Sequence, residues 1–317
     1  LIEGPTMGTQ YHIKVVATDA NHKSEEFQNT LKSLVTDKLV AINQSMSTYI
    51  DDSELSLINQ APIDEWINLS PDLFELLMLC NKVSVESDGA FDTTVGPLVN
   101  LWGFGPSKTE VIPSQHQIND LLVRIGYQKI ILDAAKDTNT GRIKKSSDLY
   151  IDLSSAAKGF AADLLAREFR ALNLQNFMIE VGGELYVSGT NAQGKSWTIG
   201  VEKPSLLHDG SLQAIHVSNV GIATSGEYRN YYEVDGVRAS HTIDPSIGKP
   251  IHHKLVSVTV ISEMGALSDA YATALNVMGP EKGFLLAEKL ELAAYFIVKS
   301  DDGFVTKYTP SFKPYLE

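Results

Sequence analysis

The stretch LVSVTVISEMGALSDAYATALNVMG, from Leu255 to Gly279, changes from a strand pattern to a helix pattern. Its first eight residues are rich in valine, isoleucine and threonine, which is typical of a strand. Alanine and leucine then favour a helix, which Ser268 is predicted to cap and Gly279-Pro280 to end. The stretch therefore predicts a strand followed directly by a helix.

Asp269 and Thr273 lie four residues apart on this helix, so their side chains share one face. A carboxylate beside a hydroxyl offers hard oxygen ligands, which suit Mg²⁺ better than a metal that prefers thiolates. A second interpretation is that Asp269 only offsets the helix dipole and that Thr273 only fills the core.

The segment DLSSAAKGFAADLLAREF, from Asp152 to Phe169, reads as a loop of small residues that runs into an amphipathic helix. The start of such a helix attracts anions, because its unpaired N–H groups point outward and small side chains let a phosphate approach. Lys158 adds a positive charge there. The alternative is a capped helix with a solvated lysine. The P-loop spacing GxxxxGK[ST] is absent, so a nucleoside triphosphatase is not indicated.

The chain has 317 residues, of which 43% are hydrophobic, so it can bury a large core as one domain or as two closely joined subdomains. No run approaches the roughly 20 apolar residues that span a bilayer. The net charge of -13 argues against a general affinity for nucleic acid or anionic lipid, which requires clustered Lys and Arg. The basic residues Lys144-Lys145 near Arg142 are predicted to lie in a solvated loop.

The single cysteine, Cys80, falls on a predicted apolar helix face and is expected in the core. One thiol permits neither a disulfide within the chain nor a zinc site built from thiolates. It is compatible with a cytoplasmic or an exported protein. No signal peptide is present, but the chain starts at Leu1 rather than Met, so removal of a leader is compatible with the sequence.

Strand and helix patterns do not alternate regularly, so the predicted fold class is α+β with mixed or antiparallel sheets and packed helices. Asp235-Gly236 between YYEV and VRAS is the strongest hairpin signal. The other predicted strands are residues 9–18, 129–132, 197–204, 212–226, 255–262, 293–299 and two around Gly182-Gly183, and the helices are residues 24–46, 71–87, 116–125, 268–279 and 281–289.

Two further polar groups are ambiguous. Gly182-Gly183-Glu184 suits close approach of the backbone to a ligand, and it suits a tight hairpin turn equally well. His241 is a candidate general base near neutral pH, although a lone histidine usually has no such role. The pair His252-His253 lacks further metal-ligand spacing and is expected at the surface. No GxSxG elbow is present.

Eight ordered motifs resemble the ApbE family of FAD:protein FMN transferases over nearly the whole chain. They are TMGT (residues 6–9), MSTYIDDSELSLIN (46–59), DGAFDTTVGPLVNLWGFGP (88–106), DLSSAAKG (152–159), EVGGELYVSG (180–189), SGEYRNYY (225–232), SHTIDPSIGKP (240–250) and SDAYATAL (268–275). The resemblance implies an ApbE-like, T-fold-like architecture with FAD in a cleft between subdomains. It also implies an Mg²⁺-dependent transferase that cleaves FAD, releases AMP and attaches FMN through a phosphoester bond to Thr or Ser of an acceptor flavoprotein.

The resemblance also implies site residues. Asp269 and Thr273 are expected to bind Mg²⁺ through their side chains and Ser155 through its backbone carbonyl, although the family often has Ala or Thr at that position. His241 is the candidate for deprotonating or positioning the acceptor hydroxyl. The positions that resemble the family's FAD contacts are Met7, Tyr49, Ala90, Phe91, Asp92, Asp152, Lys158 and Ile243.

Alternatives remain within the resemblance. If water replaces the acceptor, the protein is an FAD pyrophosphatase, and without the metal pair it would be a non-catalytic periplasmic FAD-binding protein. Asp92 and Asp244-Pro245 can each be scaffold that shapes a turn. The family implies a bacterial lipoprotein exported to the periplasmic side of the inner membrane, anchored only through lipid on an N-terminal Cys. It implies acceptors among the subunits of respiratory redox complexes.

Overall fold

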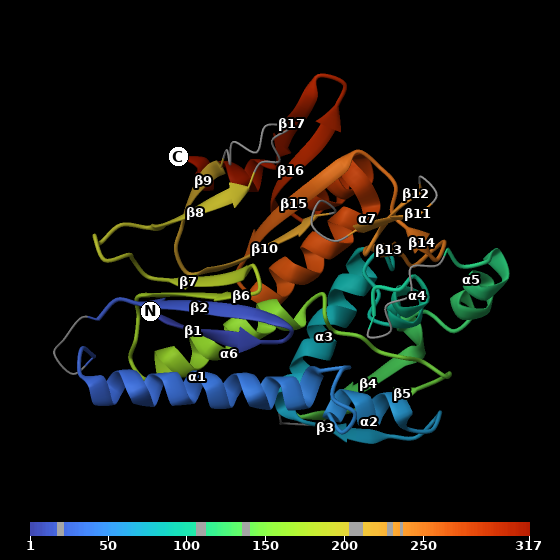
Figure 1. Cartoon of the computed structure of the whole chain (residues 1–317), viewed down its shortest axis with the longest axis horizontal. Helices are drawn as coiled ribbons and strands as arrows, with labels where there is room; N and C mark the ends of the chain where they lie inside the picture. The colour runs from blue at the N-terminus through green and yellow to red at the C-terminus, as the bar shows by residue number, and fades with distance from the viewer. Residues whose placement is uncertain (18–21, 106–111, 135–139, 203–211, 227–230, 235–236) are drawn as a thin grey trace.

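An antiparallel sheet of eight strands forms the centre of the molecule (Figure 1). The structure is a computed structural model that describes residues 1–17, 22–105, 112–134, 140–202, 212–226, 231–234 and 237–317. The order of the strands is β1 (Ile2–Thr6), β2 (Thr9–Val15), β6 (Phe177–Val181), β7 (Glu184–Ser188), β10 (Val220–Gly226), β15 (Leu255–Ser262), β16 (Ala293–Ser300) and β17 (Gly303–Tyr308).

The two faces of this sheet bury different clusters of side chains, because successive residues of a strand point to opposite faces. In β10, Ile222 belongs to one cluster and Ala223 to the other. The larger cluster lies under α6 (Ala157–Ala171) and α7 (Gly265–Lys289), with α1 (Glu25–Met46) and α3 (Pro71–Glu86) packed outside them. The hairpin of β8 (Trp197–Glu202) and β9 (Leu212–Val217) covers the other face with the 3-10 helix Pro310–Leu316.

Smaller elements complete the chain at the side of α3 and α7 (Figure 1). They are the helices α2 (Glu54–Gln60), α4 (Gly96–Leu101) and α5 (Gln115–Leu122), a three-stranded sheet of β3 (Ile67–Leu69), β5 (Gly141–Lys145) and β4 (Ile130–Ala134), the 3-10 turn Tyr127–Lys129, and the strand pairs β11 (Tyr231–Val234) with β12 (Val237–Ser240) and β13 (Ile243–Asp244) with β14 (Lys249–Pro250). The predicted α+β class with antiparallel sheets is confirmed. The prediction of one domain or two joined subdomains stays a prediction.

Helix α7 begins a full turn earlier than its sequence predicts. Gly265 is its first residue and Met264 its N-cap, so the prediction that Ser268 caps it is wrong. The Ser268 hydroxyl is buried and donates to the carbonyl of Gly221 at 3.0 Å. Gly279 has a φ of 78° and interrupts the helix before Pro280, as the sequence predicts. Asp269 therefore lies beyond the first turn, where an offset of the helix dipole is weak.

The starts of α6 and α7 meet so closely that only glycine fits. A Cβ at Gly159 would lie 2.2 Å from the carbonyl oxygen of Gly265. Asp163 of α6 accepts hydrogen bonds from the N–H groups of Gly265 at 2.7 Å and Ala266 at 2.9 Å. A side chain of α6 thus caps α7, which has no side-chain cap of its own.

Several local predictions can be compared with the structure. Strands β11 and β12 pair as the hairpin predicted around Asp235-Gly236, although those two residues lie outside the described part. Cys80 is buried as expected. The solvated loop predicted at Lys144-Lys145 is wrong: both residues belong to β5, and the buried Lys145 donates to the carbonyl of Asn59 at 2.8 Å.

His253 also departs from its predicted surface position. Its ring is partly buried, and its Nε2 lies 2.7 Å from the carbonyl oxygen of Asn276 on α7. A Cβ at Gly279 would lie 2.9 Å from the ring, so the interruption of α7 makes room for this histidine. Burial lowers the pKa of His253 below its usual value.

Among the helices in the described ranges, none combines the length and the apolar character that a membrane crossing requires.

Candidate active site

Three charged side chains from different elements meet where α6 and α7 begin. The Lys158 ammonium, in the first turn of α6, lies 2.7 Å from Oε1 of Glu184 at the start of β7. Asp269 of α7 accepts a hydrogen bond from the N–H of Gly159 at 3.2 Å. Glu184 and Asp269 are 5% and 6% exposed, so both carboxylates are largely removed from water. The tertiary structure thus joins DLSSAAKG, EVGGELYVSG and SDAYATAL.

The turn between β6 and β7 makes room for Lys158. Gly182 and Gly183 have φ values of 61° and 105°, a left-handed region that favours glycine. A Cβ at Gly182 would lie 3.1 Å from Cδ of Lys158 and 2.6 Å from the side chain of Thr9. Because Gly182 has no side chain, the stem of Lys158 can lie against this turn of the β6–β7 hairpin, close to Thr9 of the β1–β2 hairpin. Glu184, two residues later, then lies beside the Lys158 ammonium.

The three charges influence one another. Burial raises the pKa of the Glu184 carboxyl, and the charge of Asp269 raises it further, against the opposing effect of Lys158. Burial also raises the pKa of Asp269, while Lys158 and the Gly159 N–H oppose that increase. Burial disfavours the charged form of Lys158, but Glu184 and Asp269 outweigh it and raise the pKa of the ammonium. The cluster therefore holds Lys158 charged between two carboxyls that are costly to ionise together.

The residues predicted to hold Mg²⁺ fit such an ion by the chemistry of their donors. The Gly159 hydrogen bond is the one that the described residues make to the Asp269 carboxylate, and it leaves Oδ1 available. Thr273 follows one turn later on α7 and is partly exposed, as is Ser155 just before α6. In the described ranges, no three His, Cys, Asp or Glu side chains gather as a metal site would require. A metal here therefore needs hydroxyl and carbonyl oxygens, which Mg²⁺ accepts.

Two further predicted residues, Asp152 and Tyr49, both influence Tyr150. The N–H of Asp152 donates to the carbonyl of Thr93 at 2.7 Å, and its Oδ1 accepts from the N–H of Ser154 at 2.8 Å. Burial raises the pKa of the adjacent Tyr150, and Asp152 and Tyr49 add to that increase, so these side chains lie around one ring. Tyr49 is 68% exposed, which leaves an aromatic face for a flavin.

Asp92 serves the turn that contains it. Its Oδ1 accepts from the N–H of Thr94 at 2.8 Å and from the Thr94 hydroxyl at 2.7 Å, and its Oδ2 accepts from the N–H of Tyr127 at 3.0 Å. Burial raises the pKa of this carboxyl despite these bonds. Ala90 and Phe91 precede it, and the side chain of Phe91 is buried in the main core. These contacts support the scaffold interpretation of Asp92.

The described contacts of His241 and Ile243 involve residues other than the charged cluster. His241 lies beside Phe104, with 6.3 Å between the ring centroids. Ile243 is buried in a separate apolar cluster with Leu98, Trp102, Ile118 and Ile125. The turn at Asp244-Pro245 is confirmed, because the Gly248 N–H donates to the carbonyl of Asp244 at 2.8 Å between β13 and β14.

Met7 lies in the tight turn between β1 and β2, with a φ of 48°. Thr9, two residues later, approaches Gly182, which also touches the stem of Lys158. The β1–β2 hairpin therefore approaches the stem of Lys158 two residues after Met7.

Glu184 is the residue of this cluster that is absent from the predicted site residues. Its sequence signal is the GGE triplet, which indicates a ligand contact or a tight turn equally well. The structure shows both at once, because the turn places the carboxylate on Lys158.

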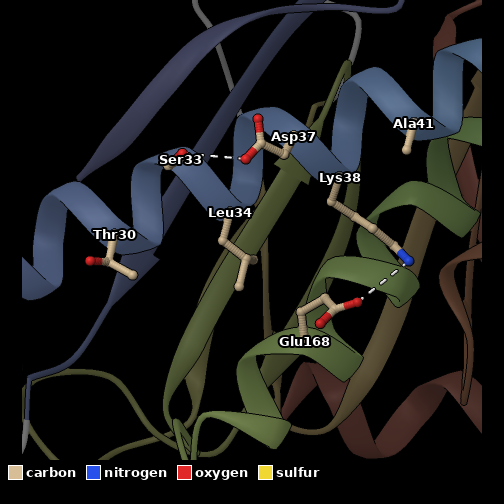
Figure 2. Close-up of a pocket in the computed structure, with 7 residues that line it drawn as sticks. All are labelled: Thr30, Ser33, Leu34, Asp37, Lys38, Ala41 and Glu168. Atoms are coloured by element: carbon tan, nitrogen blue, oxygen red, sulfur yellow. Dashed lines mark hydrogen bonds and ion pairs between the residues drawn. The ribbon is translucent and has the colours of Figure 1, made fainter.

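A groove between α1 and α6 lies apart from these residues (Figure 2). Lys38 of α1 pairs with Glu168 of α6 across it, at 3.4 Å. None of the predicted site residues lines this groove, which Thr30, Ser33, Leu34, Asp37, Lys38, Ala41 and Glu168 form.

The fold and the charged cluster define an α+β protein with oxygen donors and an ammonium at the start of two crossing helices, an arrangement that suits a metal and a phosphate group. The chain belongs to the ApbE family, whose model matches residues 7–296. An FAD:protein FMN transferase of Haemophilus influenzae is 41% identical over 320 residues, which covers 100% of this chain and 91% of the relative.

Solved structures agree with this assignment. The flavin transferase ApbE of Vibrio cholerae superposes with a TM-score of 0.88 at 38% identity, over 99% of this chain and 98% of that one. The apo form of the Pseudomonas stutzeri flavinyl transferase ApbE gives a TM-score of 0.89 at 37% identity, over 100% of this chain and 96% of that one. The predicted ApbE-like architecture is confirmed.

Proposed function

We propose that this protein is an FAD:protein FMN transferase that depends on Mg²⁺ and modifies Thr or Ser of an acceptor flavoprotein. The observation that carries the proposal is the buried Asp269, which has an available oxygen and lies one helix turn before Thr273 and next to Lys158. Family membership and relatives with this name over the full chain support the same reaction.

The balanced reaction joins the acceptor hydroxyl oxygen to the phosphorus on the FMN side of FAD. The phosphoanhydride bond breaks, and AMP leaves with the electron pair while the hydroxyl proton goes to a base. Phosphoryl transfer depends mainly on alignment and on neutralising charge. Mg²⁺ held by Asp269, Thr273 and the carbonyl of Ser155 would supply much of that neutralisation.

The remaining residues act through charge, shape and proton transfer. Lys158 pairs with a phosphate oxygen at the start of α6, which has no side-chain cap of its own. Tyr49 offers its exposed ring to the flavin, and Asp152 offers an acceptor. His241 takes or directs the acceptor's proton. Met7, Ala90, Phe91, Asp92 and Ile243 shape the nucleotide site, chiefly through backbone and turn geometry.

The test is the intact mass of a candidate acceptor domain after incubation with this protein, FAD and Mg²⁺, with AMP release followed in parallel. A gain of one FMN that EDTA or Asp269→Ala abolishes is the expected result. Cleavage of FAD to AMP and free FMN in the presence of every candidate acceptor, without labelling of any of them, would identify an FAD pyrophosphatase. Retention of FAD without either product would identify a binding protein and overturn the proposal.

We also propose that the protein acts on the periplasmic side of the bacterial inner membrane as a lipoprotein, and that its acceptors are subunits of respiratory redox complexes. The support is the family resemblance. Fractionation of cells that express the native gene, with labelled palmitate, tests the location. Recovery of unlipidated protein in the cytoplasm would contradict it.

A further inference from the structure

One oxygen of the Glu184 carboxylate lies inside the charged cluster without a hydrogen-bond partner. Its Oε1 contacts the Lys158 ammonium at 2.7 Å, while Oε2 is buried and no donor among the described residues meets hydrogen-bond geometry with it. The N–H of Glu184 itself lies close enough to the carboxyl to lower its pKa, but it makes no hydrogen bond to Oε2. Two other buried side-chain atoms in the described part share this state, Ser147 Oγ and Asn276 Oδ1, and neither belongs to the cluster. Glu184 thus combines an unmet acceptor with a position beside Lys158 and Asp269.

A buried acceptor without a donor is costly, by about 1–3 kcal/mol and more when the group is charged. Native proteins retain few such atoms, and those that persist call for an explanation. The pairing with Lys158 explains Oε1 only. Glu184 begins β7 immediately after the glycine turn and is only 5% exposed, so water has little access to its carboxylate. The cluster therefore contains one acceptor that a donor on a bound ligand can satisfy.

The proposed substrates supply one kind of neutral donor near the phosphates. FAD carries hydroxyl groups on its ribityl chain and its ribose, and the acceptor presents the hydroxyl of Thr or Ser. A neutral hydroxyl suits Oε2 better than a second cation, because the Lys158 ammonium already occupies the other oxygen. Hydrogen bonds from a hydroxyl to a carboxylate are among the strong ones.

We propose that Glu184 is a substrate-contacting residue: Oε1 holds the Lys158 ammonium, and Oε2 accepts a hydrogen bond from a substrate hydroxyl, either of FAD or of the acceptor's Ser or Thr. The inference rests on the proposed transferase function and deepens it. It differs from a purely positioning role, in which Glu184 would act only through Lys158.

The decisive variant is Glu184→Gln, which keeps the size of the side chain and an oxygen for Lys158 but replaces Oε2 with an NH₂ donor. FAD binding is measured first by flavin fluorescence without an acceptor, and FMN transfer is then measured at saturating FAD. A loss of FAD affinity of tenfold or more assigns the donor to FAD. Unchanged affinity with a kcat at least tenfold lower assigns it to the acceptor hydroxyl.

The control variant is Glu180→Gln on the neighbouring strand. Glu180 also carries a negative charge near Lys158, but its two oxygens are engaged by the Gly183 N–H at 2.6 Å and by Nδ1 of His12 at 2.5 Å. Glu180→Gln is expected to leave affinity and kcat within about twofold. Equal losses in both variants would reduce the effect to general charge and overturn the inference.

A double-mutant cycle with Lys158→Met separates contact from positioning. If Glu184 contacts the substrate, Glu184→Gln still reduces binding or kcat when Lys158 is already methionine. If its effect disappears in that background, or if Glu184→Gln behaves as wild type, the inference fails while the transferase stands. A wild-type protein that binds FAD but labels no acceptor overturns the transferase function, and the binding measurement then still tests the FAD contact.

Discussion

The starts of α6 and α7 each receive a buried aspartate from the other helix, and the two aspartates differ in how their oxygens are used. Both carboxylate oxygens of Asp163 on α6 accept hydrogen bonds, from the N–H groups of Gly265 and Ala266 at 2.7 and 2.9 Å. Asp269 of α7 receives one longer hydrogen bond, 3.2 Å from the Gly159 N–H. The first aspartate joins the helices, while the second keeps an oxygen available at the same crossing.

This difference separates scaffold from site more clearly than burial does, because both side chains are nearly inaccessible to water. A buried carboxylate with both oxygens hydrogen-bonded needs no ligand to satisfy its acceptors. A buried carboxylate with one oxygen left without a hydrogen bond is stabilised when a ligand supplies a donor or a cation to that oxygen. Asp92 belongs with Asp163 by this criterion, and Glu184 belongs with Asp269.

The largest effect is expected at Asp269. Asp269→Asn keeps the shape of the side chain but removes the charge that a metal needs, so FMN transfer should fall by about 10³-fold. The free energy of unfolding should stay equal or increase, because burial disfavours the ionised form of Asp269 and the amide removes that charge. Transfer assays and urea denaturation check both statements. A loss of stability with retained Mg²⁺-dependent activity would break the comparison.

Asp163→Ala should have the opposite profile. It leaves the N–H groups of Gly265 and Ala266 unpaired at the buried start of α7, which should cost about 2–4 kcal/mol of unfolding free energy. Asp37→Ala on the exposed face of α1 is the matched control and should change little. An Asp163→Ala protein that unfolds at the wild-type denaturant concentration would contradict the capping role.

The pH dependence of stability sharpens the same comparison. Burial raises the pKa of Asp163 to about 7, against the two backbone hydrogen bonds and Arg167. An unfolded aspartate has a pKa of about 3.9, so the folded state binds more protons between these values. The contribution of Asp163 to the unfolding free energy should therefore fall as pH rises from about 4 to 7.

Denaturation of the wild type and of Asp163→Asn over this pH range measures that contribution as the difference between the two proteins. If the free energy of unfolding of the wild type falls relative to that of Asp163→Asn as pH rises, the stated sign is supported. If it rises relative to that of Asp163→Asn, the ionised carboxylate is the form that caps α7.

Gly159→Ala tests how close the two helices must be. The added methyl would lie 2.2 Å from the carbonyl oxygen of Gly265, so the helices must separate, at a cost of about 1–3 kcal/mol. Gly265→Ala would meet the carbonyl oxygen of Gly159 at 2.5 Å and should behave alike. Because separation also moves Lys158 away from Asp269, FAD affinity should fall as well. Wild-type stability and affinity in both variants would show that the crossing is not tight.

Much of the fold could be predicted because local patterns carry it. The helices at α1 and α3 and the strands β2, β6, β7 and β15 follow from periodicity. The start of α7 could not be predicted, because its cap comes from Asp163, far away in the sequence. β5 resembled a polar loop, since nothing local shows that Lys145 is buried on the carbonyl of Asn59.

Part of the site could be predicted in the same way. The spacing of Asp269 and Thr273 on one helix face and the place of Lys158 at a helix start are local properties. The role of Glu184 is not local, and its triplet had two equally good interpretations.

The sequence by itself determined which segments become strands and helices, which side chains share a helix face, and which family the motifs resemble, because periodicity and spacing act over a few residues. The tertiary structure alone decided that Lys158, Glu184 and Asp269 meet, and that Asp163 is satisfied while Asp269 is not. The reason is physical: the value of a buried charge depends on its partners, and packing brings those partners from distant parts of the chain.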